Sequence, residues 1–391
     1  MSLAYEFTAP RRIVFGSGKR RELGTLVAAL GQRVFLLPGS RALERNGEIS
    51  SAIDRLQQAG LAVETLAGIS REPQVSDVDQ VVQRIRSLEP REGDVLLALG
   101  GGSAIDLAKA TAAVVAHPEA DGIACFLEGA SPKLEVTREV LPIVAVPTTA
   151  GTGSEATRNG VVSSPEQRAK RSIRSEKLLP RLVVVDPELT LSLPPAITAA
   201  TGLDAITQLI ESYISRRATP MSRMLALQGL PGTCEALRTA CRDGSHLPSR
   251  EILAQAALLS GLALANSGLG LAHGVAAALG VHAEVTHGLA CAVMLPAALR
   301  YNLACKTDDL ATISWLLLGP GGDSPAQAAQ RLIDTIETLL LELQIPRQLR
   351  ELGVTREQLP ELVRDSRGNS LSGNPRDVSD TELREVLESV W

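Results

Sequence analysis

The sequence predicts two domains: an N-terminal α/β domain with a parallel sheet over residues 1–187, and an all-helical domain over residues 188–391. Three observations predict this division. Short runs rich in Val, Leu and Ile alternate with helical patterns in the first half. Such runs stop after Asp186 and Pro187, where a proline-containing connection begins. The length of 391 residues is enough for two domains with substantial cores.

The five expected strands are rich in Val, Leu and Ile and show no regular alternation of polar and apolar residues. That pattern is typical of parallel strands covered by helices on both faces. Helical patterns lie between them at residues 46–60 and 76–90. We expect the strands at residues 33–39, 61–68, 94–102, 141–149 and 181–187.

The second half contains only helical patterns. Residues 252–281 hold no Asp, Glu, Lys or Arg and are long enough to cross a membrane. Polar side chains, among them Gln255, Asn266 and His273, interrupt this stretch, and no aromatic belt marks its ends. A buried helical hairpin at the centre of the helical domain therefore fits better than a membrane span.

Composition excludes several classes of partner. The net charge is −5 and aromatic residues are 2% of the chain, so neither a nucleic acid nor an anionic membrane surface is expected as a partner. The five cysteines include no CxxC pair, which is typical of reduced thiols. The N-terminus lacks an apolar signal core, so we expect a cytoplasmic protein.

Two turns that follow strands are candidates for binding a ligand. In residues 94–110 a strand leads through three glycines, residues 100–102, into a helix, and Ser103 is expected to cap that helix. Free N–H groups at a helix start suit a pyrophosphate. Ile105 breaks the usual G-x-G-x-x-G pattern, so a plain tight turn stays open as an alternative.

The second turn, within residues 141–159, carries four hydroxyl side chains directly after a strand. Hydroxyls at the carboxyl end of a parallel strand lie where α/β sheets bind ligands. A solvated polar loop is the alternative. The four residues are Thr148, Thr149, Thr152 and Ser154.

Three histidines lie in the very apolar stretch of residues 268–290, where a titratable side chain is costly unless something binds it. His273 and His287 would be ~21 Å apart in one continuous helix, so the segment between them is expected to break. Asp204, which shares a helix face with Gln208, could then join both imidazoles in a site suited to Fe²⁺ or Zn²⁺. Histidines satisfied by backbone groups are the alternative.

Together these motifs resemble the iron-containing, or group III, alcohol dehydrogenases, which are relatives of glycerol dehydrogenase and dehydroquinate synthase. The resemblance runs along nearly the whole chain. It rests on "GGGSAIDLAKA", "PTTAGTGSEAT", "GLGLAHGVAAALG" and "THGLACAVMLP", in this order. It implies the dehydroquinate synthase-like fold, with a nucleotide-binding α/β domain, a helical metal-binding domain and an active site in the cleft between them.

The resemblance also implies ligands for each domain. The implied metal ligands are Asp204, His273 and His287, and the implied metal is Fe²⁺ or Zn²⁺. A fourth ligand, usually a histidine, is Gln208 here, and a substrate-facing histidine of the family is replaced by Ala277. The residues implied to hold NAD or NADP are Gly101, Gly102, Ser103, Asp106, Thr148, Thr149, Thr152, Ser154, Lys170 and Leu189.

Two histidines are expected to act in catalysis, His273 through the metal and His282 as a pocket-lining proton carrier. We expect a metal-dependent, NAD(P)-linked alcohol dehydrogenase or aldehyde reductase that works as a homodimer. Its substrate is expected to be a small, polar alcohol or aldehyde, because Arg158 and Asn159 adjoin the hydroxyl turn. The alternatives are a cyclising lyase like dehydroquinate synthase, which needs a basic pocket, and a non-catalytic nucleotide-binding relative.

Cofactor choice is expected to depend on the end of the first apolar strand. NAD-preferring relatives carry an aspartate there, which would repel the 2′-phosphate of NADP. This chain has Gly39, followed by Ser40 and Arg41, whose hydroxyl and guanidinium can bind a phosphate. We therefore expect NADP to be accepted and preferred, and Gly39→Asp to swing the preference toward NAD by at least ~10-fold.

Overall fold

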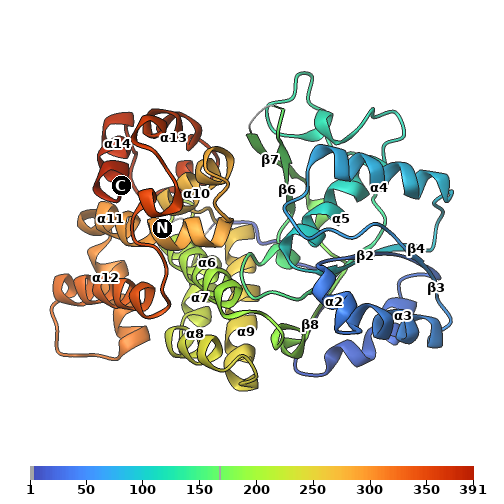
Figure 1. The fold of residues 1–391 in the computed structure, drawn as a ribbon, viewed down its shortest axis with the longest axis horizontal. Coiled ribbons are helices and arrows are strands. Elements are labelled where there is room, and N and C mark those ends of the chain that lie inside the picture. Colours follow the sequence, from blue (N-terminus) through green and yellow to red (C-terminus); the bar gives the residue numbers. More distant parts are fainter. Residues whose placement is uncertain (1–3, 167–168) are drawn as a thin grey trace. The chain divides into compact units, whose positions relative to one another are not determined.

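The computed structural model describes residues 4–166 and 169–391, which form two compact units (Figure 1). The α/β unit comprises residues 9–149 and 154–190. The helical unit comprises residues 4–8, 150–153 and 191–391. The main change of unit therefore follows residue 190, close to the predicted boundary at 187. Neither of the two short segments in the helical unit was predicted, because their assignment depends on contacts with distant helices.

The α/β unit is built on a six-stranded sheet in the order β1-β8-β5-β4-β2-β3, and every neighbouring pair is parallel. The strands are β1 (Ile13–Phe15), β2 (Arg33–Pro38), β3 (Ala62–Thr65), β4 (Asp94–Gly100), β5 (Ile143–Pro147) and β8 (Leu182–Val185). All five strands expected from the sequence are present, but β3 is an edge strand whose four residues are exposed or half-buried, so the expectation that it is buried is wrong. The edge strand β1 was missed, because a strand of three residues is too short to show a pattern.

Helices cover both faces of this sheet (Figure 1). Phe35 and Leu37 of β2 pack with α4 and α5, whereas Val34 and Leu36 pack with α1 and α3. All four side chains are fully buried, which explains why no polar residue alternates along β2. The helices are α1 (Leu23–Ala28), α2 (Arg41–Arg45), α3 (Glu48–Gln58), α4 (Val75–Ser87) and α5 (Gly102–Val115).

The carboxyl ends of three neighbouring strands lie side by side. Pro38 of β2 is in register with Leu99 of β4, and the next residue of β4 is in register with Pro147 of β5. The segments that follow these strands therefore leave the sheet next to one another. This is the edge at which open α/β sheets bind ligands.

An antiparallel hairpin of β6 (Asn159–Ser164) and β7 (Ala169–Arg174) stands apart from the main sheet and packs against α5. The sequence did not predict it. Its strands mix polar and apolar residues and are mostly half-buried, so they lack the continuous apolar run of the central strands.

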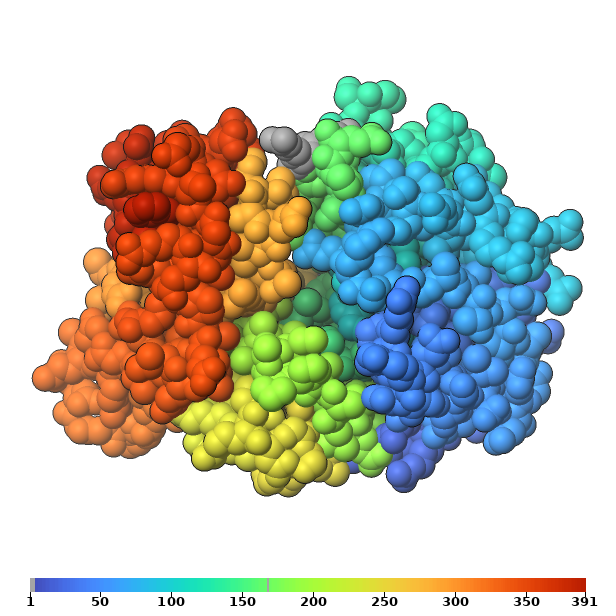
Figure 2. Space-filling view, viewed as in Figure 1, coloured from blue at the N-terminus to red at the C-terminus, as the bar shows by residue number. Residues whose placement is uncertain are grey.

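The helical unit has one large apolar core, to which α6, α10 and α11 all contribute. In Figure 2 the C-terminal helices, drawn in red, lie against earlier helices of the same unit, drawn in orange. The contacts between α13 and α10 agree with this arrangement. The helices are α6 (Pro195–Ile214), α7 (Pro220–Gly229), α8 (Thr233–Arg242), α9 (Leu247–Ala265), α10 (Leu271–His282), α11 (His287–Leu318), α12 (Pro325–Glu342), α13 (Leu359–Asp365) and α14 (Asp380–Ser389).

The apolar stretch 252–281 forms two buried helices, α9 and α10, as predicted. They are not a hairpin packed on itself, which corrects the expectation: α9 packs chiefly on α6, α7 and α8, and α10 packs chiefly on α11 and α13. Among the described residues, α11 is long and apolar enough to cross a membrane by length and composition alone. However, 61% of its most apolar window is buried within the protein.

Candidate metal centre and nucleotide-binding turns

Four potential metal ligands from three helices converge in the helical unit. They are Asp204 of α6, His273 of α10, and His287 and Cys291 of α11, and their ligand atoms all lie within 4.8 Å of one another. Asp204 Oδ1 is 3.4 Å from His273 Nε2 and 3.8 Å from His287 Nε2. The structure thus brings together the carboxylate and the two imidazoles expected from the sequence. Cys291 was not predicted.

Two atoms of this cluster indicate that an ion belongs there. Asp204 Oδ1 and His273 Nε2 are buried and have no hydrogen-bond partner in the described part of the chain. Leaving buried polar atoms without a partner is costly, and a cation between them would satisfy both. One carboxylate and two imidazoles fit Fe²⁺ or Zn²⁺. The residues present therefore fit the metal that the resemblance implies.

The break in the apolar stretch that brings the histidines together is confirmed. Helix α10 ends at His282, Glu284 has a positive φ of 53°, and α11 begins at His287. The chain turns within these few residues, so that the start of α11 lies beside α10. His287 is then in the first turn of α11, and Cys291 follows one turn later on the same face.

Glu211 of α6 orients His273. Its carboxylate accepts hydrogen bonds from the backbone N–H groups of Gly270 (3.0 Å) and Ala272 (2.7 Å) at the start of α10. It also lies 2.7 Å from His273 Nδ1. A carboxylate that accepts from one ring nitrogen leaves the other free for a metal. The role of Glu211 was not predicted, because it depends on the packing of α10 beside α6.

The electrostatics of the cluster favour positive charge. Burial alone would lower the pKa of His273, but Cys291, Asp204 and Glu211 raise it well above its ordinary value. Cys291 and Asp204 raise the pKa of His287 to about 9, against the effect of burial. Burial would raise the pKa of Asp204, but the charges of His287 and His273 lower it. A divalent cation would replace the protons of the imidazoles and supply the same charge.

In the α/β unit, the glycine turn after β4 leads directly into α5. Gly101 is the N-cap residue with an extended backbone, α5 begins at Gly102, and no side chain caps it. Ser103 is therefore inside the first turn, and the expectation that it caps the helix is wrong. The backbone N–H groups at this helix start remain suited to a phosphate. A Cβ on Gly101 would lie 3.1 Å from the side chain of Thr149, so the two turns are adjacent.

A buried lysine organises the second turn. Lys109 of α5 is fully buried, and its ammonium donates to the backbone carbonyls of Ser154 (2.5 Å), Thr157 (2.7 Å) and Asn159 (3.0 Å). Asp106, one turn earlier in α5, accepts a hydrogen bond from the Ser154 hydroxyl. These contacts define the backbone of the turn. The sequence did not single out Lys109, because nothing local distinguishes it from an exposed helical lysine.

Glu155 makes the stability of this unit depend on pH. Burial raises its pKa from 4.5 to about 7, against the opposing charge of Lys109. The folded protein thus holds a proton that the unfolded chain loses above about pH 4.5. We expect the free energy of unfolding to fall by roughly 3 kcal/mol as the pH rises from about 4.5 to 7 because of this group. Denaturation with urea across this range, for the wild type and Glu155→Gln, measures the effect.

Glu155→Gln should show a flatter pH dependence than the wild type. The exposed Glu92→Gln variant, which removes the same charge at the surface, should retain the wild-type slope. Equal slopes for the wild type and Glu155→Gln would contradict the assignment.

Three further residues implied to bind the cofactor make other contacts, two of them in the α/β unit and one in the helical unit. Lys170 of β7 forms an ion pair of 2.6 Å with Glu72. Leu189 is 3% exposed and packs in the core beneath the sheet. Thr152 belongs to the helical unit, where its carbonyl accepts a hydrogen bond from Gln208. Their roles toward a cofactor stay predictions.

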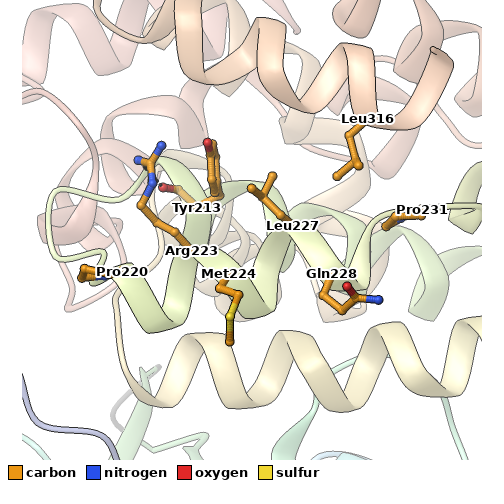
Figure 3. A pocket seen from close by; sticks show the side chains of 8 residues that line it. All are labelled: Tyr213, Pro220, Arg223, Met224, Leu227, Gln228, Pro231 and Leu316. Carbon is orange, nitrogen blue, oxygen red and sulfur yellow. Dashed lines mark hydrogen bonds between the residues drawn. The ribbon is translucent and has the colours of Figure 1, made fainter. Parts of the chain in front are cut away.

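A surface groove of roughly 560 Å³ also occurs on the helical unit (Figure 3). It is lined by Tyr213, Pro220, Arg223, Met224, Leu227, Gln228, Pro231 and Leu316. Arg223 stacks on the ring of Tyr213 and pairs with Asp309. The groove therefore presents a mostly apolar surface whose one charged side chain is already paired, and we do not assign the chemistry to it.

Comparison with known families identifies the family of this chain. The family "Iron-containing alcohol dehydrogenase" matches residues 10–187, and "Fe-containing alcohol dehydrogenase family, C-terminal" matches residues 198–391. The chain belongs to the iron-containing alcohol dehydrogenase family. The resemblance seen in the motifs is thereby confirmed.

Individual members of this family match the whole chain. The 1,3-propanediol dehydrogenase of Klebsiella pneumoniae is 33% identical, over 99% of this chain and 99% of its own length. The NAD-dependent methanol dehydrogenase of Bacillus methanolicus is 31% identical, over 98% of this chain and 99% of its own. A solved 1,3-propanediol oxidoreductase has a TM-score of 0.93 and 31% identity, covering 99% of this chain and 100% of that one.

Membership in the iron-containing alcohol dehydrogenase family confirms the predicted fold and class of reaction. The chain is an NAD(P)-dependent alcohol dehydrogenase or aldehyde reductase. These relatives favour the oxidoreductase over a cyclising lyase. The convergent ligand cluster likewise counts against a nucleotide-binding relative that has lost its metal site.

Two residues of this chain, Gln208 and Ala277, depart from the family pattern. Gln208 uses its amide nitrogen to donate to Thr152 O (3.0 Å) and Ser260 Oγ (2.8 Å), which leaves the amide oxygen as its possible ligand atom. Ala277 lies one turn after His273 in α10 and offers no proton-transferring group. The family's usual histidines at these two positions are thus absent from a site whose other ligands converge.

His282 is not brought to the metal cluster. Its Nε2 lies 2.7 Å from Asp365 and its Nδ1 lies 3.4 Å from Glu361, both in α13. It ends α10, nine residues after His273, about 13 Å further along the helix. Its predicted role as a proton carrier in catalysis stays a prediction, and these two carboxylates give it a structural role.

Gly39 has a packing role that the sequence did not reveal. A Cβ at this position would lie 2.7 Å from the Cα of Gly100, closer than side chains tolerate. Gly39→Asp would therefore move the backbone at the end of β2 and β4. This corrects the expectation that Gly39→Asp isolates the effect on cofactor preference. A cleaner test must use Ser40 or Arg41.

Proposed function

We propose that this enzyme holds Fe²⁺ or Zn²⁺ on Asp204, His273 and His287, and that it interconverts a small, polar alcohol and its aldehyde with NADP(H) preferred over NAD(H). One observation gives the main support for assigning a metal to these three residues. Two buried ligand atoms, Asp204 Oδ1 and His273 Nε2, face each other at 3.4 Å without a hydrogen-bond partner among the described residues. A bound cation removes that cost.

The chain's own residues prepare this site for the reaction. When bound, the metal supplies Lewis-acid polarisation of the substrate oxygen. Glu211 holds His273 in the orientation that directs Nε2 inward. The surrounding segments of α6 and α10 are buried and apolar, which strengthens electrostatic interactions by excluding water. Hydride transfer itself is the chemistry of the nicotinamide.

The substrate class has two supports. Two of the relatives that match nearly the whole chain are named for methanol and for 1,3-propanediol, which are small alcohols. Arg158 and Asn159 follow the hydroxyl turn, and the Arg158 side chain is 44% exposed, with Glu176 at 3.3 Å. A polar substrate fits such a surface better than a long aliphatic one.

The oligomeric state and the cellular location of the enzyme are proposed as well. We propose a homodimer in the cytoplasm. All five cysteines are free, which suits a reducing compartment. Size-exclusion chromatography with light scattering measures the assembly, and a monomer would contradict it.

A substrate panel tests the proposed function. Short primary alcohols, diols, hydroxy acids and the corresponding aldehydes are each assayed with NAD(H) and NADP(H), on protein with its metal content measured. We expect turnover of small polar substrates with net cofactor oxidation or reduction. Turnover by metal-free protein, or metal without net change of the cofactor, would contradict the proposal.

Arg41 is expected to select NADP. It is exposed at the first position of α2, directly after the Ser40 hydroxyl, and it makes no ion pair within the described residues. Arg41→Ala should lower kcat/KM for NADP by about 10-fold, since one contact to phosphate is worth roughly 1.4 kcal/mol. It should change kcat/KM for NAD little, because NAD lacks that phosphate.

Arg45→Ala is the matched control, because Arg45 is exposed in the same short helix. It should leave the ratio of the two kcat/KM values unchanged. A wild-type enzyme that strongly prefers NAD, or an equal loss for both cofactors in Arg41→Ala, would overturn the cofactor assignment.

A further inference from the structure

Cys291 differs from an ordinary core cysteine by its neighbours. It is fully buried in α11, one turn after His287, and its Sγ lies 3.7 Å from His287 Nε2. The same sulfur is within 4.8 Å of the ligand atoms of Asp204 and His273. Cys234 of α8 is also buried in the core of the helical unit, but it lies outside this cluster.

The spacing of the cluster matches a four-ligand ion. Metal–ligand bonds of about 2.0–2.3 Å place neighbouring ligand atoms of a tetrahedral zinc ion about 3.3–3.7 Å apart. The separations to Asp204 Oδ1 are 3.4 Å from His273 and 3.8 Å from His287. The separation from Cys291 Sγ to His287 Nε2 is 3.7 Å. The sulfur thus lies at a ligand-to-ligand distance from His287 and within 4.8 Å of the other two ligand atoms, close enough to serve as a fourth ligand.

We propose that Cys291 is a thiolate ligand of the metal, completing a set with Asp204, His273 and His287. The proposal rests on the metal site of the proposed function and goes beyond it by naming the fourth donor and the class of metal. A metal deprotonates a coordinating thiol. The charges of the carboxylate and the thiolate then balance a divalent ion, without another anion in the buried site.

The thiolate determines which metals the site prefers. Soft sulfur favours Zn²⁺, Fe²⁺ and Co²⁺ over hard ions such as Mg²⁺ and Mn²⁺. It also accounts for the missing histidine at position 208, since the sulfur supplies a strong donor where Gln208 offers only an amide oxygen. Zinc can expand from four to five ligands in catalytic sites, so a four-ligand set does not exclude substrate.

Cobalt spectroscopy tests the proposal directly. Chelator-treated, full-length protein is titrated with Co²⁺, which gives weak visible bands when bound and an intense near-ultraviolet charge-transfer band when a thiolate coordinates it. We expect both for the wild type. Cys291→Ala should keep the visible bands and lose the charge-transfer band. Its Zn²⁺ affinity should fall by about 100-fold or more, beyond the usual effect of an outer-shell substitution.

Controls separate the outcomes. Cys234→Ala, a buried cysteine outside the cluster, should retain the full spectrum, and Cys291→Ser replaces Cys291→Ala if the alanine variant does not fold. Visible cobalt bands without the charge-transfer band in the wild type would overturn the role of Cys291 and leave the metal site of the proposed function intact. Absence of cobalt binding in the wild type would overturn both.

Discussion

His273→Ala is expected to release the metal and to lower kcat/KM by at least about 100-fold. The imidazole is buried and its Nε2 faces Asp204 without another partner in the described residues. Its removal leaves the ion with fewer donors and leaves the Glu211 carboxylate without the ring nitrogen it contacts at 2.7 Å. Elemental analysis of the purified variant and steady-state turnover with both cofactors measure the two effects.

His246→Asn is the matched control for this experiment. His246 is an exposed histidine of the helical unit that caps α9, and asparagine is also a good capping residue. It should keep wild-type metal content and activity. Full activity of His273→Ala, or activity of any preparation that contains no metal, would show that the ligand assignment is wrong.

Lys109→Met is expected to destabilise the α/β unit by about 3–5 kcal/mol, the usual cost of breaking a buried charged network. The methionine side chain fills most of the volume, but the carbonyls of Ser154, Thr157 and Asn159 lose their common donor. Burial lowers the pKa of Lys109 to about 8, against the charges of Asp106 and Glu155, so the ammonium form predominates at neutral pH. Denaturant unfolding at pH 7 measures the loss.

The same substitution should raise the Kd for the cofactor, because the turn held by Lys109 carries the hydroxyl residues expected to line it. Lys19→Met serves as the control, since Lys19 is half exposed and pairs with Glu22 at the surface. It should alter the free energy of unfolding by less than about 0.5 kcal/mol. A loss below about 1 kcal/mol in Lys109→Met would show that the buried network does not hold the turn.

Several features of this protein were predictable because they depend on neighbours in the sequence. Strand β4 is a nearly continuous apolar run closed by glycines, and such a run is typical of a strand covered on both faces. The break between α10 and α11 followed from fourteen residues of spacing, since an unbroken helix would keep His273 and His287 ~21 Å apart. The ligand triad with Asp204 followed from the family motifs.

Other features depend on which distant segments pack together, and the sequence does not contain that information locally. Nothing in the sequence around Gly39 indicates its contact with Gly100, because that contact forms only when β2 and β4 pair. The sequence therefore indicated only a role of position 39 in cofactor choice, whereas the structure shows that a Cβ there would meet the backbone of Gly100. Ser103 was misplaced for a smaller reason, a helix that begins two residues earlier than its capping preference indicated.

By itself the sequence determined the fold class and the family, and it predicted three metal ligands and two ligand-binding turns at the sheet edge. Only the tertiary structure decided that Glu211 orients His273, that Lys109 holds the second turn, and that Cys291 joins the cluster. The physical reason is the same in all three cases. A buried charged or thiol side chain is stabilised by partners from other segments, and the packing of whole helices determines which partners those are.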